Sequence, residues 1–218
     1  MAEKLIHIFK DFLDLLIPQK CLGCGANNAI LCNKCLNSLP DAPFSKERTI
    51  FAATSYQDEI VKKAIRLLKY HGIKSLAEPL TELMFKRQDN LISKLAKNPE
   101  ESLIIPIPLS KKRYRERGYN QAELIGQFLS DKMSIRMEIN VLYKIKDIAS
   151  QVEIKDREKR LKNIIGAFAV KNPEIIKNKN VILIDDITTT GATLNEARHI
   201  LKQAGAKRII GWVVAKGG

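Results

Sequence analysis

The chain has 218 residues, 45% of them hydrophobic, and it carries a formal net charge of +13 with a pI of about 9.6. This length and apolar fraction support one α/β domain with a substantial core and leave room for a small appendage. The basic charge suits phosphorylated small molecules, nucleic acid or an acidic surface as partners, but charge alone does not choose among them.

The composition also excludes two classes of protein. All four cysteines lie between positions 21 and 35, which argues against the distributed disulfide framework of a secreted fold. No run of about 18 uninterrupted apolar residues occurs, and Asp11 and Asp14 stand where a signal peptide would have its apolar centre. We therefore expect a cytoplasmic protein without a membrane span.

The first predicted element is an amphipathic helix over residues 4–17, which ends at Pro18. Its apolar side chains fall on one broad face, and its charged side chains lie largely opposite. Packing on the segment that follows is the favoured explanation of this face, with a membrane-surface role as the alternative.

Two Cys-x-x-Cys pairs follow this helix, and they place Cys21 and Cys24 shortly before Cys32 and Cys35. Four thiolates at this spacing fit around a tetrahedral zinc at about 2.3 Å, whereas a redox pair needs one such motif. Because four thiolates leave no open coordination position, we expect a structural zinc that stabilises this module and leaves the downstream domain formed.

A turn-rich stretch over residues 38–43 indicates a linker after the cysteines. We therefore divide the chain into an N-terminal helix with a zinc knuckle, residues 1–43, and a larger α/β domain, residues 44–218. In the larger domain the pattern first predicts a strand over residues 49–56, a helix over 59–70 and a second helix over 75–97.

Residues 103–108 predict a buried strand that leads directly into a basic loop over residues 109–122. Ligands of open parallel sheets collect where strands end, so this loop is expected to face the main crevice. Lys111, Arg113 and Arg117 are the candidate catalytic cations. An exposed basic turn is the simpler explanation for Lys112 and Arg115.

After the helix that follows this loop, residues 139–145 predict another strand. The Lys- and Arg-rich segment 151–163 has no strong apolar stripe, which is typical of a long loop in a functional lid or of disorder. Residues 208–215 predict the last buried strand.

The most informative stretch is the apolar run Val181 to Ile184, followed by Asp185 and Asp186 and then by T-T-T-G-A-T between Thr188 and Thr193. The run predicts a strand buried on both faces, and the segment after it predicts a helix that ends at Gly205. The loop between them would offer backbone N–H groups, hydroxyls and the positive end of a helix dipole to an anion.

The two acids indicate which anion binds there. Asp185 and Asp186 can accept hydrogen bonds from a vicinal diol while the loop holds a phosphate, which is the arrangement of groups in a ribose 5-phosphate. A buried strand with a Thr-rich turn and a capping aspartate is the structural alternative for any one of these residues. The signatures of a Walker loop and of a dinucleotide-binding fold are both absent from the sequence.

The motif I-L-I-D-D-I-T-T-T-G-A-T resembles the phosphoribosyl-pyrophosphate (PRPP) loop of the type I phosphoribosyltransferases. The resemblance implies that Asp185 and Asp186 hold the ribose hydroxyls. It also implies that the loop wraps the 5-phosphate with a continuous set of residues, namely Thr188, Thr189, Thr190, Gly191, Ala192 and Thr193.

The order of motifs along the whole chain resembles the ComF family, which is linked to bacterial DNA uptake and natural transformation. That order comprises the four cysteines, I-P-I-P-L-S with a basic R-x-R-x-x-R-G-Y-N-Q-A, a segment from Gln151 to Arg160, and the PRPP loop. The resemblance implies an open parallel sheet flanked by helices, PRPP bound with magnesium, Arg160 as a further catalytic cation, and Lys69 near the site.

Three functions are compatible with these features. We expect a phosphoribosyltransferase, in which Lys111, Arg113 and Arg117 would neutralise the departing pyrophosphate. A DNA-handling module that tracks single-stranded DNA along basic loops is the second, although only 6% of residues are aromatic. The third is a regulator that binds PRPP without turnover. The acceptor substrate and the oligomeric state cannot be inferred from the sequence.

Overall fold

The fold is known from a computed structural model, which describes residues 20–44, 49–87, 90–145 and 164–217. The helix predicted over residues 4–17, the lid-like segment 151–163 and Arg160 lie outside these ranges. Within them, no helix has the length and apolar character needed to cross a membrane.

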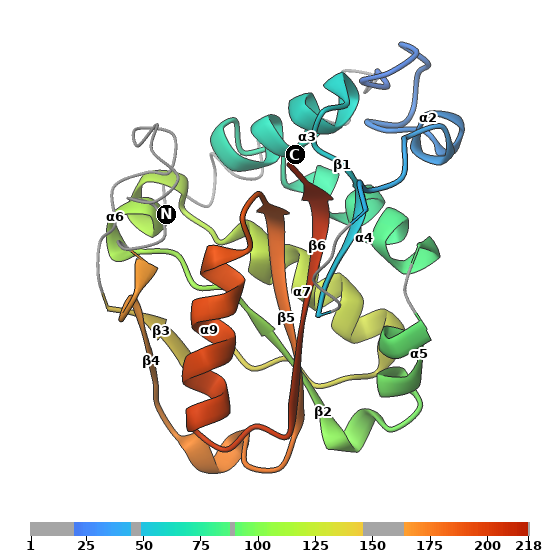
Figure 1. The fold of residues 1–218 in the computed structure, drawn as a ribbon. Coiled ribbons are helices and arrows are strands. Elements are labelled where there is room, and N and C mark those ends of the chain that lie inside the picture. The colour runs from blue at the N-terminus through green and yellow to red at the C-terminus, as the bar shows by residue number, and fades with distance from the viewer. Residues whose placement is uncertain (1–19, 45–48, 88–89, 146–163, 218) are drawn as a thin grey trace, which may run out of the picture.

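A four-stranded parallel sheet forms the centre of the molecule, as the buried apolar runs predict (Figure 1). Its strands lie in the order β1-β6-β5-β2, so the strand that carries the two aspartates has a neighbour on each side. Residues Val181 to Ile184 are fully buried. The bounds are β1 (Ile50–Ser55), β2 (Ser102–Pro106), β5 (Asn180–Thr188) and β6 (Arg208–Lys216).

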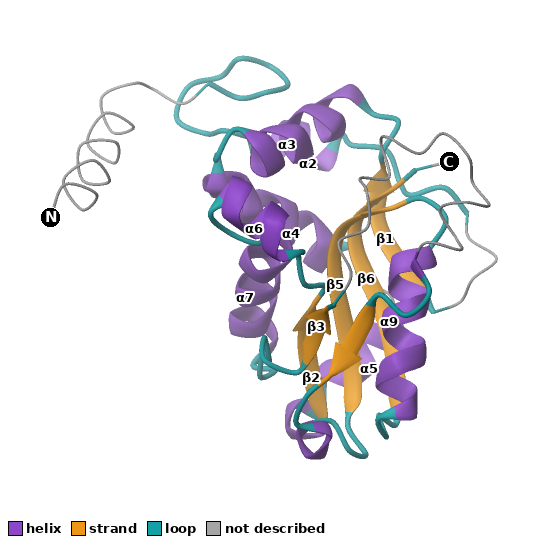
Figure 2. Ribbon diagram, turned by 90° about the vertical axis from the view of Figure 1, so that its left-hand side faces the viewer, coloured by secondary structure: helices purple, strands orange, loops and turns teal. Residues whose placement is uncertain are grey.

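Helices cover both faces of this sheet, and Figure 2 shows the layers edge-on. One face packs against α4 (Ala77–Lys86) and α7 (Gln121–Met133), which contact the strands directly. The other face packs against α9 (Ala192–Gln203). A separate antiparallel pair, β3 (Leu142–Lys144) and β4 (Phe168–Val170), lies beside α9. This is the open parallel sheet flanked by helices that the resemblance to the ComF family implied.

Two predicted elements differ in the structure. The helix expected over residues 75–97 is divided into short helices, because Arg87 ends α4 and donates hydrogen bonds to the carbonyls of Leu39, Pro40 and Ala53. The basic loop expected after β2 contains a helix, α6 (Lys111–Arg117), which Ser110 caps by accepting from the Arg113 N–H.

The other helices of the described residues are α2 (Asn33–Asn37), α3 (Glu59–Tyr70), η1 (Lys74–Leu76), α5 (Asn90–Ala96), η2 (Pro99–Glu101) and η3 (Pro173–Ile175).

The cysteine segment packs into the core of the larger domain. Cys35 and Leu36 are buried in the same hydrophobic cluster as Val61 of α3 and Leu83 of α4. Beyond the cysteines, the predicted linker is fixed in place, because the Thr54 hydroxyl and Arg87 both donate to the carbonyl of Pro40. The division of the chain at residue 43 stays a prediction, but the described part of the segment shares its core with the domain that follows.

Candidate functional site

A cleft of about 1180 Å³ opens where β5 and β2 end, between α3 and α6. Figure 1 shows both helices near the arrowhead of β5. Ligand pockets commonly have volumes of about 300–1,000 Å³, so this cleft has room for a sugar phosphate together with a second reactant. Among the residues that the structure describes, the charged lining has seven cations, Lys62, Lys63, Arg66, Lys69, Arg113, Arg117 and Lys144, and three acids, Glu59, Asp185 and Asp186.

Asp186 lies deep in the cleft and pairs with Lys69 of α3. The Lys69 Nζ is 2.9 Å from Asp186 Oδ2, and the Asp186 side chain is only 3% exposed. Burial by itself would lower the pKa of Lys69, but the charges of Asp186 and Asp185 outweigh it and raise that pKa above its ordinary value. Lys69 therefore stays protonated beside the two carboxylates.

Asp185 is half-buried next to it, and its Oδ1 accepts from the backbone N–H of Asp186 at 2.8 Å. Burial and the neighbouring charge of Asp186 raise the pKa of Asp185 to about 7. The sequence pattern suggested that the two acids end the strand. In the structure, β5 continues past them to Thr188. Asp186 itself does not face solvent, because Lys69 of α3 covers it.

The threonine loop connects β5 to α9. Thr188 is the last residue of the strand and is paired with Lys216 of β6, so only the residues after it form the loop. Thr189 and Thr193 line the cleft. Gly191 caps α9 with a φ of 77°, a left-handed conformation that glycine adopts at low cost. The Thr190 hydroxyl accepts from the N–H of Ala192 at 3.4 Å.

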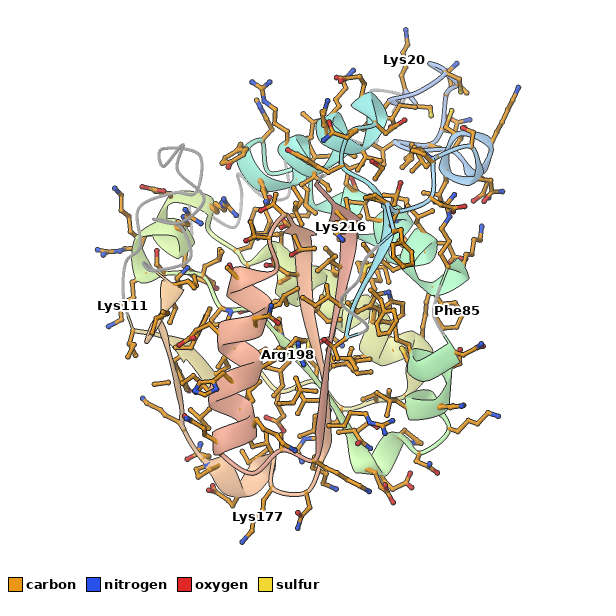
Figure 3. The ribbon with its side chains drawn as sticks, in the orientation of Figure 1. Lys20, Phe85, Lys111, Lys177, Arg198 and Lys216 are labelled. Atoms are coloured by element: carbon orange, nitrogen blue, oxygen red, sulfur yellow. The ribbon has the colours of Figure 1, made fainter. Side chains whose placement is uncertain are left out.

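The predicted cations of the basic segment divide between two sides of α6. Arg113 and Arg117 line the cleft, and Arg117 donates to Gln121 Oε1 at 2.8 Å. Lys111 is exposed and is not a lining residue, and Figure 3 shows it at the outer edge of the molecule. A helix in place of the expected loop explains this difference, because its residues point in several directions around the axis.

Apart from Lys69, which the resemblance placed near the site, sequence reasoning missed the contribution of α3. Lys62, Lys63 and Arg66 line the cleft together with Tyr70, whose ring lies 5.0 Å from the Arg117 guanidinium. The available signal was the charged face of a helix that follows the first strand of the sheet. A charged face is usually just a solvated surface, so the pattern alone does not single it out.

The four cysteines form a second site, away from the cleft lining. Their sulfurs all lie within 4.8 Å of one another, which is compatible with one shared metal ion. Burial alone would raise the pKa of Cys21, but hydrogen bonds from the backbone of Cys32, Cys24 and Gly23 lower it to about 6. These N–H donors favour the thiolate of Cys21, which is the form that binds zinc, whereas burial and the neighbouring sulfurs raise the pKa of Cys35 to about 12. A metal is indicated by the four sulfurs, which are close enough to share one ion. The donor set therefore fits a structural zinc.

Residues 121–218 match the phosphoribosyl transferase domain family. Together with the parallel sheet and its flanking helices, the match defines a phosphoribosyltransferase-like protein of the type I fold. Adenine phosphoribosyl transferase from Trypanosoma brucei superposes with a TM-score of 0.44 and 13% identity, covering 80% of this chain and 86% of that one.

Longer matches give the family. The chain is 31% identical over 199 residues to competence protein F of Haemophilus influenzae, covering 90% of this chain and 84% of that protein. It is 35% identical over 120 residues to competence protein ComFC of Streptococcus pneumoniae, covering 55% and 50%. DNA utilization protein YhgH of Salmonella typhi is 24% identical, covering 92% and 84%. The chain therefore belongs to the competence protein F (ComF) family.

Proposed function

We propose that this protein binds PRPP with magnesium in the cleft and transfers its phosphoribosyl group. The single observation that supports this most is the convergence of three kinds of groups on one cleft. Asp185 and Asp186 supply acceptors at the end of β5, Thr189 and Thr193 supply hydroxyls beside the start of α9, and Arg113 and Arg117 supply charge from α6.

Each part of PRPP has a complementary group in this arrangement. The ribose hydroxyls donate to the two carboxylates, and the 5-phosphate accepts from the threonine loop and the first N–H groups of α9. The pyrophosphate lies toward Arg113 and Arg117. Magnesium, which enters with PRPP, supplies further positive charge for the leaving group. Lys111 is not part of this proposal, since its side chain is exposed away from the cleft.

The surplus of cations favours turnover over simple sensing. Loss of pyrophosphate leaves an oxocarbenium-like sugar and concentrates negative charge on the departing group. Preorganised positive charge stabilises such a transition state more than the ground state. Arg113 and Arg117 provide it without any protein nucleophile, while the charge of Lys69 is offset by Asp186. A regulator that binds PRPP without turnover is the alternative that this argument disfavours.

A second candidate function is binding of single-stranded DNA, and it rests on charge outside the PRPP-binding groups. Lys112 and Arg115 are exposed on α6, and Lys63 and Arg66 are exposed on α3. The relatives named competence and DNA utilization proteins favour a role in DNA uptake for this chain as well. Such a surface would bind the phosphate backbone without reading sequence.

The test is a calorimetric titration of PRPP with and without magnesium, followed by a pyrophosphate-release assay with candidate bases and with single-stranded DNA. We expect magnesium-dependent binding and release of pyrophosphate in the presence of one acceptor. Binding without any release supports the regulator. The absence of PRPP binding combined with tight DNA binding supports the DNA-handling module.

A further inference from the structure

The turn that joins α6 to α7 contacts two other walls of the cleft. It consists of Gly118, Tyr119 and Asn120, and Gly118 ends α6 with a φ of 74°. Tyr119 and Asn120 are both buried, at 8% and 1% exposure. Two consecutive buried polar side chains are costly unless each makes hydrogen bonds. Their partners therefore indicate what the turn is for.

Tyr119 reaches the last turn of α3. Its hydroxyl donates to the backbone carbonyl of Leu68, while the neighbouring carbonyl of Leu67 accepts from the N–H groups of His71 and Ile73. The last carbonyls of a helix lack partners within the helix, so a side-chain donor from another element fixes this end of α3. The Tyr119 ring also lies 5.0 Å from Lys74 Nζ, in the segment just after α3.

Asn120 reaches the end of β2. Its Nδ2 donates to the carbonyl of Ile107 at 3.0 Å, and its Oδ1 accepts from the N–H of Ala122 at 3.0 Å. The turn is thus anchored to the strand end and to the start of α7. From that fixed base, Tyr119 extends to α3 and sets how α3 lies against α6.

The Leu68 carbonyl belongs to the same peptide group as the N–H of Lys69. A donor that holds this carbonyl also holds the backbone from which Lys69 reaches Asp186, at 2.9 Å. The next residue, Tyr70, stacks with Arg117 across the same junction. We propose that Tyr119 is a positioning residue, which holds Lys69 on Asp186 and the Tyr70 ring on Arg117. The consequence for PRPP rests on the proposed function, whereas the position of Lys69 does not.

The test replaces the hydroxyl alone, in Tyr119→Phe. Tyr143→Phe is the matched control, because the Tyr143 hydroxyl also donates to a backbone carbonyl, that of Asn140, at an exposed position. Acylation of lysines followed by mass spectrometry reports on Lys69 directly. Lys132, which pairs with Glu82 at 2.7 Å on another part of the surface, serves as the internal standard.

We expect Tyr119→Phe to increase the acylation rate of Lys69 several-fold and leave that of Lys132 unchanged. We also expect it to weaken magnesium–PRPP binding about tenfold, because a buried carbonyl that loses its donor destabilises the turn around it. Tyr143→Phe should change neither quantity. Equal labelling of Lys69 in the variant and the parent overturns the proposal, and so does a parallel rise at Lys132, which would indicate general loosening. If the parent fails to bind PRPP, the proposed function falls, while the labelling still decides the role of Tyr119.

Discussion

Lys69 and Asp186 are separated by more than half of the chain, yet their Nζ and Oδ2 atoms lie 2.9 Å apart. The pair joins α3 to the end of β5 and places one cation and one carboxylate at the base of the cleft. An ion pair in such a place is expensive to break, because removal of one partner leaves the other charge poorly solvated. The contact therefore links the stability of the fold to the site.

Lys69→Met should lower the free energy of unfolding by on the order of 3 kcal/mol, because Asp186 loses its counter-ion at a buried position. Urea denaturation measures the change. Lys62→Met is the matched control, since Lys62 pairs with the exposed Glu59 and such pairs are worth less than about 1 kcal/mol. A loss for Lys69→Met no larger than for Lys62→Met would show that the buried pair does not stabilise the fold.

The affinity for PRPP should depend on pH through Asp185, whose pKa is raised to about 7. The charged carboxylate is the form that accepts from a ribose diol without donating, so binding should strengthen from pH 6 to pH 8 and level off above. The affinity of Asp185→Asn should lack the rise that comes from Asp185. Any pH dependence that remains in the variant reports the titration of the PRPP phosphates and is subtracted from the profile of the parent. Parent and variant profiles of identical shape would refute the assignment.

The raised pKa of Asp185 should affect the stability of the fold in the opposite direction to its effect on PRPP affinity. Between the ordinary pKa of 3.8 and about 7, the folded state keeps a proton on Asp185 that the unfolded chain has released. The contribution of this group to the free energy of unfolding should therefore fall as the pH rises through that interval. Comparison of urea midpoints at pH 5 and pH 7.5, in the parent and in Asp185→Asn, isolates this contribution. A parent stability that rises with pH relative to the variant would contradict it.

Removal of zinc should affect the cleft as well as the cysteine segment. The sequence alone led us to expect an independent module, but Cys35 is part of the domain core, and a Cβ on Gly23 would lie 3.0 Å from Ile60 of α3. A zinc-selective chelator should lower the melting temperature and weaken PRPP binding together. Metal analysis should give one zinc per chain. Less than one in freshly reduced protein, or full PRPP affinity after chelation, would count against this view.

Binding of single-stranded DNA should be steeply salt-dependent and tolerant of sequence. Reversal of Lys111, Lys112 and Arg115 to Glu removes exposed charge from α6 and spares the lining residues of the cleft. If the three side chains contact phosphates, the slope of log affinity against log salt should become less steep by about 2, at roughly 0.7 per contact. Fluorescence anisotropy measures it. An unchanged slope would place the DNA, if it binds, on another surface.

The sequence predicted the parts of this protein that depend on local patterns. Apolar runs such as Val181 to Ile184 located the buried strands, because a strand covered on both faces has no polar alternation. The cysteine spacing likewise indicated a cluster of four sulfurs, since nearby residues in a tight loop cannot lie far apart. The family and the fold class came from the resemblance of the motifs, in their order along the chain, to those of a known family.

Contacts between distant elements could not be predicted in this way. Nothing in the pattern around Lys69 shows that it meets Asp186, because that depends on how α3 packs over the sheet. Arg87 ends a helix whose sequence could continue, through bonds to carbonyls that are distant in sequence. The position of Lys111 was also missed, since it depends on whether its segment is a loop or a helix.

The most direct test of the PRPP site is a magnesium–PRPP titration of the parent beside Asp185→Asn, with Asp131→Asn as the control at an exposed acid of α7. A charge-assisted hydrogen bond is worth about 1.5–3 kcal/mol, so the loss of one should weaken binding on the order of ten- to a hundredfold. The account predicts that loss for Asp185→Asn, with its fold retained, and parent-like binding for Asp131→Asn. Asp185→Asn that binds magnesium–PRPP as tightly as the parent would show that the carboxylates of β5 do not hold the ribose.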